Sequence, residues 1–196
     1  MTLIKRSSIF ITCAALVIGT WRPVCAATND VTLIEDTAEI SDCEAGTYQI
    51  VEETSEGKSI TTFIVGESYA VQDECDKNIM YSSAKSTSSS SQIYGRTLTQ
   101  INEYYDLMNV QVYKTTNDAS FYWDNTNVWV DSCQMSERHA SGYSKNVTLT
   151  SADRTKSARL YAWSRYHVTY TSSSRTFNTV NDVGCSHYGD SNYIKE

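Results

Sequence analysis

The segment from residue 158 to residue 170 alternates strictly between two kinds of side chain. One set is small, apolar or tyrosine and suits packing: Ala158, Leu160, Ala162, Ser164, Tyr166, Val168 and Tyr170. The other set is charged, aromatic or polar: Arg159, Tyr161, Trp163, Arg165, His167 and Thr169. Because neighbouring side chains of an extended chain point to opposite faces, this period of two predicts a β-strand with one packed face and one outward face.

Shorter runs of β-prone residues, separated by polar turns, predict that the whole chain is all-β. We expect strands over residues 47–53, 59–65, 68–71, 120–123, 128–133, 146–150 and 175–180. Residues 105–115 also alternate, which would place Met108, Val110 and Val112 on one face of a further strand. Residues 97–105 fit either a strand or one face of a helix. Short strands joined by Gly, Asn, Asp and Ser turns favour an antiparallel β-sandwich.

The first 27 residues have the pattern of a secretory signal peptide. Lys5 and Arg6 form a basic start, residues 7–20 are nearly all apolar or small, and Ala26 or Ala27 offers a small residue for cleavage. We therefore expect a secreted protein that acts outside the cell. By composition, the remainder divides into an acidic segment with a three-stranded meander (28–80), a serine-rich linker (81–92) and the β-sandwich domain (93–196).

Charge is spread unevenly along the chain. The 16 Lys and Arg residues and 23 Asp and Glu residues give a net charge of −7, and removal of residues 1–27 makes it −10. Between Asp30 and Lys77 there are 13 acidic residues and only two basic ones. This negative charge opposes binding to the phosphate backbone of nucleic acids. It also makes the acidic segment a candidate pro-segment, or a cover for the face that carries Arg159 and Arg165.

Four cysteines follow the signal segment, namely Cys43, Cys75, Cys133 and Cys185. An even number of cysteines in an exported chain is typical of disulfides, and four cysteines allow three connectivities. A Cys43–Cys75 bridge would close the acidic meander and leave Cys133 to pair with Cys185, and this is the pairing that we expect. No two of the four have the close spacing of a zinc-binding pair, so we expect no metal. No sequence motif indicates a cofactor.

The sequence offers only weak candidates for catalysis. A serine-based set would consist of Ser136 or Ser141 with His139 and Asp131. Serine is abundant in this chain, and no G-x-S-x-G turn is present to expose a nucleophile. Cys185 and His187 resemble a thiol–imidazole pair, although a cysteine in an exported chain is more often part of a disulfide. We therefore expect no enzymatic activity, and a small hydrolase remains a third interpretation.

The strongest functional signal is the outward row of Arg159, Tyr161, Trp163, Arg165 and His167. Guanidinium groups beside aromatic rings allow cation–π stacking, and flat rings form platforms for sugars or for the side chains of a partner. Aromatic residues in strands usually belong to the core, so a strand buried on both sides is the alternative interpretation. We expect a binding or surface-interaction protein whose ligand, a glycan or a protein, contacts this row.

A second expected function is a secreted toxin or antimicrobial factor that acts on membranes. A pore-forming hairpin needs strands with alternating apolar and polar faces. Residues 82–99 are the only candidate for such a hairpin, and their apolar alternation is poor.

Residues 123–182 resemble small secreted β-proteins of uncharacterised function from Gram-positive bacteria. The resemblance rests on WDNTNVWV, a turn followed by a Trp-containing strand, and on ARLYAWSRYHVTYTSSSRTF, a long Arg- and Tyr-rich strand with one His before a hairpin. The resemblance implies a β-sandwich and an extracellular location, and it implies no site.

Overall fold

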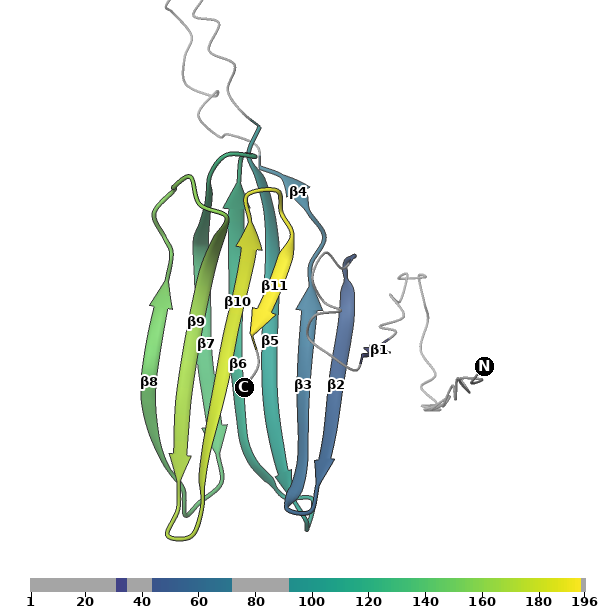
Figure 1. Cartoon of the computed structure of the whole chain (residues 1–196), viewed down its shortest axis with the longest axis vertical. Helices are drawn as coiled ribbons and strands as arrows, with labels where there is room; N and C mark the ends of the chain where they lie inside the picture. Colours follow the sequence, from purple (N-terminus) through teal and green to yellow (C-terminus); the bar gives the residue numbers. More distant parts are fainter. Residues whose placement is uncertain (1–30, 35–43, 72–91, 195–196) are drawn as a thin grey trace, which may run out of the picture.

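A computed structural model describes residues 31–34, 44–71 and 92–194 of the chain (Figure 1). These residues form strands and turns and no helix, so the predicted all-β class is confirmed. The strands are β1 (Val31–Leu33), β2 (Gly46–Thr54), β3 (Gly57–Val65), β4 (Tyr69–Ala70), β5 (Tyr94–Asp106), β6 (Gln111–Trp123), β7 (Val128–His139), β8 (Ser144–Ala152), β9 (Tyr161–Thr171), β10 (Thr176–Ser186) and β11 (Ser191–Ile194). The signal-like segment lies outside the described residues.

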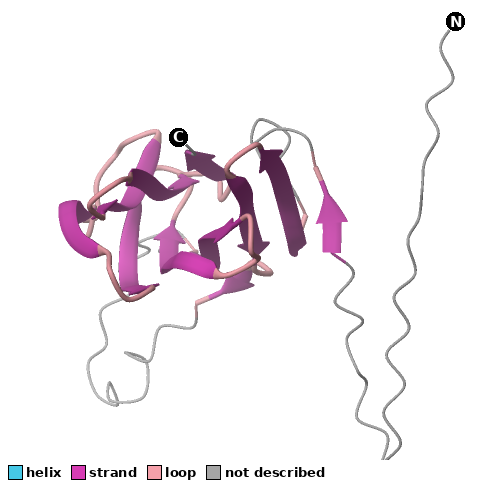
Figure 2. Ribbon diagram, turned by 90° about the horizontal axis from the view of Figure 1, so that it is seen from below, coloured by secondary structure: helices cyan, strands magenta, loops and turns pink. Residues whose placement is uncertain are grey.

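The strands form two sheets, which we call the wide sheet and the narrow sheet. The wide sheet has the order β1-β2-β3-β5-β6-β7, with β4 paired to the start of β5, and the narrow sheet has the order β11-β10-β9-β8. Strand pairs are antiparallel except β1 and β2, which run parallel. Viewed along the strands, the two sheets lie face to face as two layers (Figure 2).

Two hairpins form where the sequence predicts them, and polar side chains close their turns. Between β6 and β7, Asp124 Oδ1 accepts hydrogen bonds from the backbone N–H groups of Thr126 and Asn127, at 3.2 and 2.8 Å. Between β9 and β10, Ser172 Oγ accepts one from the N–H of Arg175 at 3.1 Å. Asp and Ser favour turns because their side chains can replace backbone partners in this way.

The apolar core lies between the sheets and receives side chains from both. Phe63, Leu98 and Phe121 of the wide sheet share one cluster with Ala162 and Val183 of the narrow sheet. A second cluster at the lower end is rich in tyrosine: Tyr104, Val112, Tyr113, Tyr166, Val168 and Tyr170. The rings of Tyr113 and Tyr170 stack across the two sheets with centroids 4.9 Å apart.

A layer of buried polar side chains separates the two apolar clusters. It consists of Gln100, Asn102, Thr115 and Asn117 from the wide sheet and Ser164, Thr179 and Asn181 from the narrow sheet. Asn117 Nδ2 donates to the carbonyl oxygens of Ser164 and Asn181 at 2.9 and 2.7 Å, and Asn102 Nδ2 donates to Thr179 Oγ1 at 2.9 Å. These bonds fix the two sheets in one relative position, because a shift of either sheet would leave buried polar groups without partners.

The acidic segment does not form a separate three-stranded meander. Residues 47–53 and 59–65 do form a hairpin, β2–β3, as predicted. However, β3 pairs with β5 from Gly57 to Val65, and β4 pairs with β5 and not with β3. Phe63 and Val65 of β3 are buried in the shared core, so this segment completes the wide sheet. Of the predicted linker over residues 81–92, all but Gln92 lies outside the described residues.

The predicted strand over residues 105–115 is wrong. β5 ends at Asp106 and β6 begins at Gln111, so residues 107–110 form a turn. The Asp106 carboxylate drives this turn by accepting hydrogen bonds from the N–H groups of Met108 and Val110, both at 2.9 Å. Met108 and Val110 are therefore exposed, whereas Val112, which the alternation placed on the same face of a strand, is buried in β6. Residues 97–105, which fitted either a strand or a helix, are part of β5.

The expected Cys133–Cys185 disulfide is not formed, and both residues are free thiols. Cys133 lies on β7 of the wide sheet, where its Sγ accepts a hydrogen bond from the Arg154 guanidinium at 3.1 Å. Cys185 lies on β10 of the narrow sheet and packs in the core beside Ala162, so the two thiols belong to different layers. Cys43 and Cys75 lie outside the described residues.

Candidate ligand-binding face

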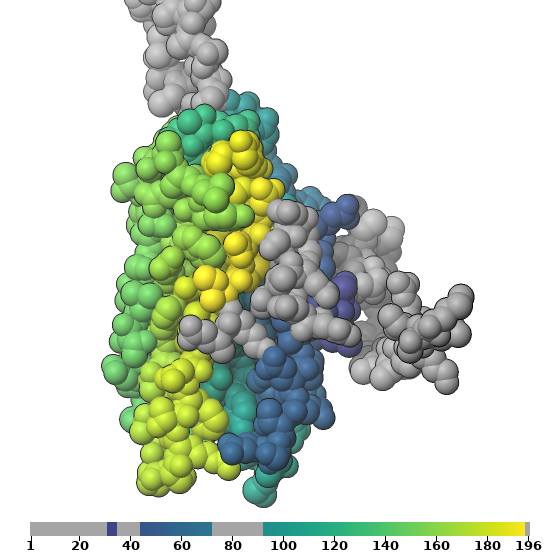
Figure 3. Space-filling model, viewed as in Figure 1, coloured from purple at the N-terminus to yellow at the C-terminus, as the bar shows by residue number. Residues whose placement is uncertain are grey.

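The structure brings four of the five predicted binding residues onto one side of one strand. Tyr161, Trp163, Arg165 and His167 alternate along β9 on the outer side of the narrow sheet, and each is half-buried. The intervening side chains from Ala162 to Tyr170 are buried against the wide sheet. Arg159 precedes the strand, which begins at Tyr161. We call this row of five residues the β9 face, and Figure 3 shows its side of the molecule.

Trp163 lies flat against the sheet because its neighbour across the hairpin is a glycine. Trp163 pairs with Gly184 of β10, and a Cβ atom at Gly184 would lie only 2.8 Å from Trp163 Cε3. One face of the indole therefore rests on the glycine backbone. The Tyr161 ring lies 5.9 Å from the indole, and the Arg165 guanidinium lies 5.5 Å from its centre, in cation–π range.

Asp182 anchors the lower half of the β9 face. Its side chain is on β10, opposite Arg165, and is only 4% exposed. His167 Nε2 lies 2.7 Å from Asp182 Oδ1, and Arg165 Nε lies 3.9 Å from Oδ2. Burial raises the pKa of Asp182, although His167 and Arg165 oppose this shift. The carboxylate thus holds two members of the face in fixed orientations from beneath.

Asp153 anchors the upper half of the face in a similar way. It follows β8 and accepts a hydrogen bond from the backbone N–H of Trp163 at 2.9 Å. Its other oxygen forms an ion pair with Arg159 Nη1 at 2.7 Å. Both arginines of the face are therefore matched by a carboxylate from a neighbouring strand or loop. The face presents many hydrogen-bonding groups with little net charge.

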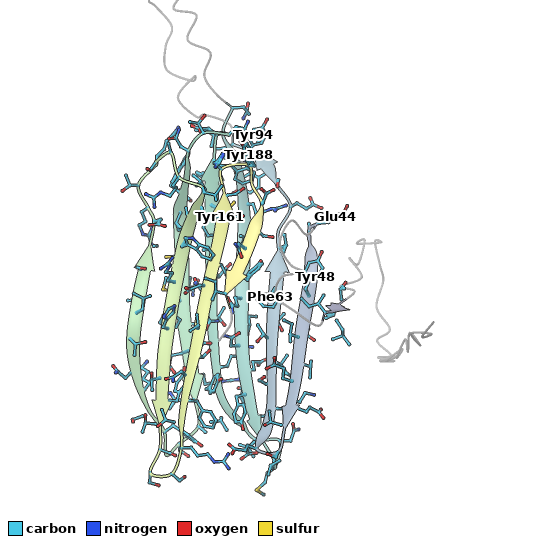
Figure 4. All side chains as sticks on the ribbon, in the orientation of Figure 1. Glu44, Tyr48, Phe63, Tyr94, Tyr161 and Tyr188 are labelled. Atoms are coloured by element: carbon cyan, nitrogen blue, oxygen red, sulfur yellow. The ribbon has the colours of Figure 1, made fainter. Side chains whose placement is uncertain are left out.

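Three residues that the sequence analysis did not assign to the face extend it at its upper end. Leu160 was expected to pack, but it precedes β9 and is exposed. Leu160 and Tyr188 are 64% and 65% exposed, and the His187 ring packs against Tyr188 with centroids 4.0 Å apart and planes inclined by 47°. The turn between β10 and β11 reaches the start of β9, because the His187 N–H donates to the carbonyl of Leu160 at 3.2 Å. Figure 4 shows Tyr161 and Tyr188 near this end. An exposed tyrosine beside a turn glycine, Tyr188-Gly189, was the only sequence signal for this extension.

A second group of aromatic residues lies on the outer side of the wide sheet. Tyr69, Gly95, Tyr122 and Trp129 are register partners across four neighbouring strands. Both tyrosine rings lean over Gly95, and Trp129 meets Tyr122 edge to face at 5.9 Å. Lys156 Nζ lies 5.0 Å from the Trp129 ring. This perpendicular packing differs from the flat indole of the β9 face.

The candidate catalytic sets are not assembled. His139 Nδ1 lies 3.0 Å from Glu137 Oε2, on the inner side of β7. Ser136 alternates with these residues, and Asp131 is the extra residue of a bulge in β7; both are exposed. Cys185 is fully buried, and burial raises the pKa of its thiol to about 12. A thiol with such a pKa holds little thiolate at neutral pH, and the thiolate is the nucleophile.

Two other predictions involve residues that the structure describes only in part. The acidic residues that it does describe, in residues 44–71, belong to the region of the wide sheet, and they do not pair with Arg159 or Arg165. Of the candidate membrane hairpin, residues 82–91 lie outside the described residues. The rest of it, from Tyr94 to Thr99, belongs to β5 and pairs with β6.

Comparison with protein-family models, with curated proteins and with solved structures finds no match for this chain. Within the described residues, no three His, Cys, Asp or Glu side chains gather as a metal site would require. The same part of the chain has no helix long and apolar enough to cross a membrane.

Proposed function

We propose that this chain is a secreted, non-catalytic binding protein of the β-sandwich type, and that the β9 face holds a carbohydrate. The observation that carries the proposal is the Trp163 indole lying flat over Gly184. A ring in this position turns its other face outward, next to the Arg165 guanidinium, and aromatic faces stack on the C–H groups of sugar rings. The signal-like segment at residues 1–27 supports a role outside the cell.

The chemistry around the indole favours a neutral sugar over a charged ligand. Arg159 is paired with Asp153, and Arg165 is near Asp182, so the arginines carry little uncompensated charge. Planar guanidinium and carboxylate groups can each bridge two neighbouring hydroxyl groups through hydrogen bonds. Paired charges around a flat ring therefore suit a ligand with many hydroxyl groups and no net charge.

The engagement of these carboxylates supports binding without catalysis. Glycoside hydrolysis needs one carboxylic acid and one carboxylate on either side of the scissile bond. Asp182 is buried beneath His167 and Arg165, and Asp153 is bound to Arg159 and to the backbone of Trp163. Both acids therefore serve to orient their neighbours.

A glycan array followed by titration calorimetry with the best neutral oligosaccharide tests the proposal. We expect Trp163→Ala to lower the affinity by at least tenfold. Loss of an aromatic ring on which a nucleobase stacks costs about 1–3 kcal/mol, and we expect a similar loss for a sugar ring stacked on the indole. The matched control is Trp129→Ala. Trp129 is also a half-buried tryptophan on an outer sheet face beside a cation, but it lies on the wide sheet. This control should keep the affinity of the unaltered protein.

Three results would overturn the assignment of a carbohydrate to the β9 face. The first is an unaltered protein that binds no glycan on the array. The second is an equal loss of affinity in the Trp129→Ala control. The third is full binding by a folded Trp163→Ala variant. If Trp163→Ala lowers the melting temperature strongly, Arg165→Ala serves in its place, because Arg165 contributes to the same face and its side chain is 42% exposed.

A further inference from the structure

The turn between β5 and β6 exposes apolar side chains where polar ones are usual. Leu107, Met108 and Val110 are 72%, 84% and 51% exposed. The turn lies at the lower end of the molecule in Figure 1, away from the turn that carries Tyr188. Surface turns are normally rich in Gly, Asn, Asp and Ser, and consecutive exposed apolar residues are a sign of function.

This apolar turn is held in one conformation by hydrogen bonds. The Asp106 carboxylate accepts from the N–H groups of Met108 and Val110, and the Asp106 carbonyl accepts from the N–H of Asn109 at 2.9 Å. Asn109 adopts a left-handed conformation with φ 59°, which asparagine tolerates well. Leu107 and Met108 are therefore presented on an ordered support, and little conformational entropy would be lost when they contact a partner.

A shallow hollow of about 240 Å³ lies beside the turn. It is lined by residues of three hairpins and of the connection between β7 and β8, namely Glu56, Asp106, Leu107, Met108, Ser174, Arg175 and Tyr143. The lining combines a guanidinium group, carboxylates and an aromatic ring next to apolar side chains. A zwitterion whose two charges are a phosphate and a quaternary amine matches this combination, because guanidinium binds phosphate while carboxylates and aromatic faces attract the amine.

We propose that this end of the protein docks on the surface of a membrane of zwitterionic phospholipid. Leu107 and Met108 enter the boundary of the acyl chains, and a phosphocholine headgroup lies in the hollow between Arg175 and Glu56. The turn lies at one end of the molecule, where it can reach between headgroups, and Tyr143 lines the hollow with an aromatic ring of the kind that favours the membrane interface. This inference does not depend on the function proposed for the β9 face.

The charges that line the hollows beside the turn favour a zwitterionic membrane over an anionic one. There, Glu53, Glu56 and Asp106 outnumber Lys58 and Arg175. Anionic lipids attract basic segments and repel acidic ones. Binding should therefore weaken as an anionic lipid is added to the vesicles.

Co-sedimentation of the chain from residue 28 with phosphatidylcholine vesicles tests the proposal. We expect Leu107→Asn combined with Met108→Ser to reduce the bound fraction at least tenfold, with an unchanged melting temperature because both side chains are exposed. Leu33→Asn is the matched control, since Leu33 is 71% exposed on the edge strand β1 and resembles Leu107 in type and exposure. The control should bind like the unaltered protein.

A tryptophan placed at the tip gives a second measurement. The fluorescence of Met108→Trp should shift to shorter wavelength on addition of the same vesicles, and lipids brominated near the headgroup should quench it. The proposal is overturned if the unaltered protein does not sediment with the vesicles, or if Leu33→Asn reduces binding equally. It is also overturned if phosphatidylserine strengthens binding. If the tip variant instead dissociates a dimer seen by light scattering, the turn is a contact between two copies and the membrane proposal is wrong.

Discussion

Replacement of Asn117 by alanine should destabilise the protein strongly, because this side chain joins the two sheets through three hydrogen bonds. Its Nδ2 donates to the carbonyl oxygens of Ser164 and Asn181, and its Oδ1 accepts from Ser164 Oγ at 2.8 Å. All three residues are fully buried. A buried polar group that loses its partner costs about 1–3 kcal/mol, and partial relaxation reduces the sum. We therefore expect the free energy of unfolding to fall by about 3–5 kcal/mol.

Equilibrium unfolding in urea measures this change. The midpoint should fall while the slope of the free energy against urea concentration stays constant, because the surface exposed on unfolding is nearly unchanged. For a domain of this size the melting temperature should fall by roughly 10 °C. Thr116→Ala is the control, since Thr116 is the next residue on β6 and points to the outer side of the wide sheet. If Asn117→Ala costs no more than Thr116→Ala, the polar layer does not hold the sheets together as we argue.

Two further predictions concern the β9 face and the β6–β7 turn. Gly184→Ala should lower carbohydrate affinity at least tenfold in calorimetry while the protein stays folded, because the added Cβ would lie 2.8 Å from Trp163 and must lift the ring. Unchanged affinity would show that the flat position of the ring does not matter for carbohydrate binding. The second prediction concerns Asp124: burial acts to raise its pKa, but hydrogen bonds from Lys156 and Asn127 outweigh it and lower the pKa to about 2. The depressed pKa of this acid adds stability above pH 3.8, and this stability is lost as the pH falls towards 2. In urea unfolding, the free energy of unfolding of the unaltered protein should therefore exceed that of Asp124→Asn by less and less across that range. A difference that stays constant would contradict the lowered pKa of Asp124.

The part of the fold that the sequence predicts is the part with clear alternation and polar turns. The β9–β10 hairpin follows from the alternation of residues 158–170 and the serines at 172–174. The long strand β6 was predicted at its two ends, within the expected strands 105–115 and 120–123, and missed in its middle, because its inner side there carries Thr115 and Asn117. Where both sides of a strand are polar, the period of two disappears from the sequence. The buried polar layer is therefore the feature that sequence periodicity could not find.

The sequence also predicts the candidate site only in part. The alternation placed Tyr161, Trp163, Arg165 and His167 on one side of β9, and the structure brings them together there. It could not show that Trp163 lies on a glycine, or that Asp182 lies beneath His167, because both facts depend on the register between β9 and β10. The turn that contains Tyr188 comes close to the β9 face only because of the path of the chain between β10 and β11. These features depend on how strands pair and connect, which the sequence of a single strand does not determine.

The turn at residues 107–110 is the clearest case in which a local polar group outweighs hydrophobic patterning. Alternation placed Met108 and Val110 in a strand, yet one carboxylate, that of Asp106, binds both of their N–H groups and turns the chain. Exposure of these apolar side chains to water is unfavourable by roughly 25 cal/mol per Å². A turn of polar residues would avoid this cost and could keep the same hydrogen bonds, since these involve only the backbone of residues 108 and 110. Stability of the hairpin therefore does not explain the presence of Leu107 and Met108 in this turn, whereas the membrane contact that we propose would explain it.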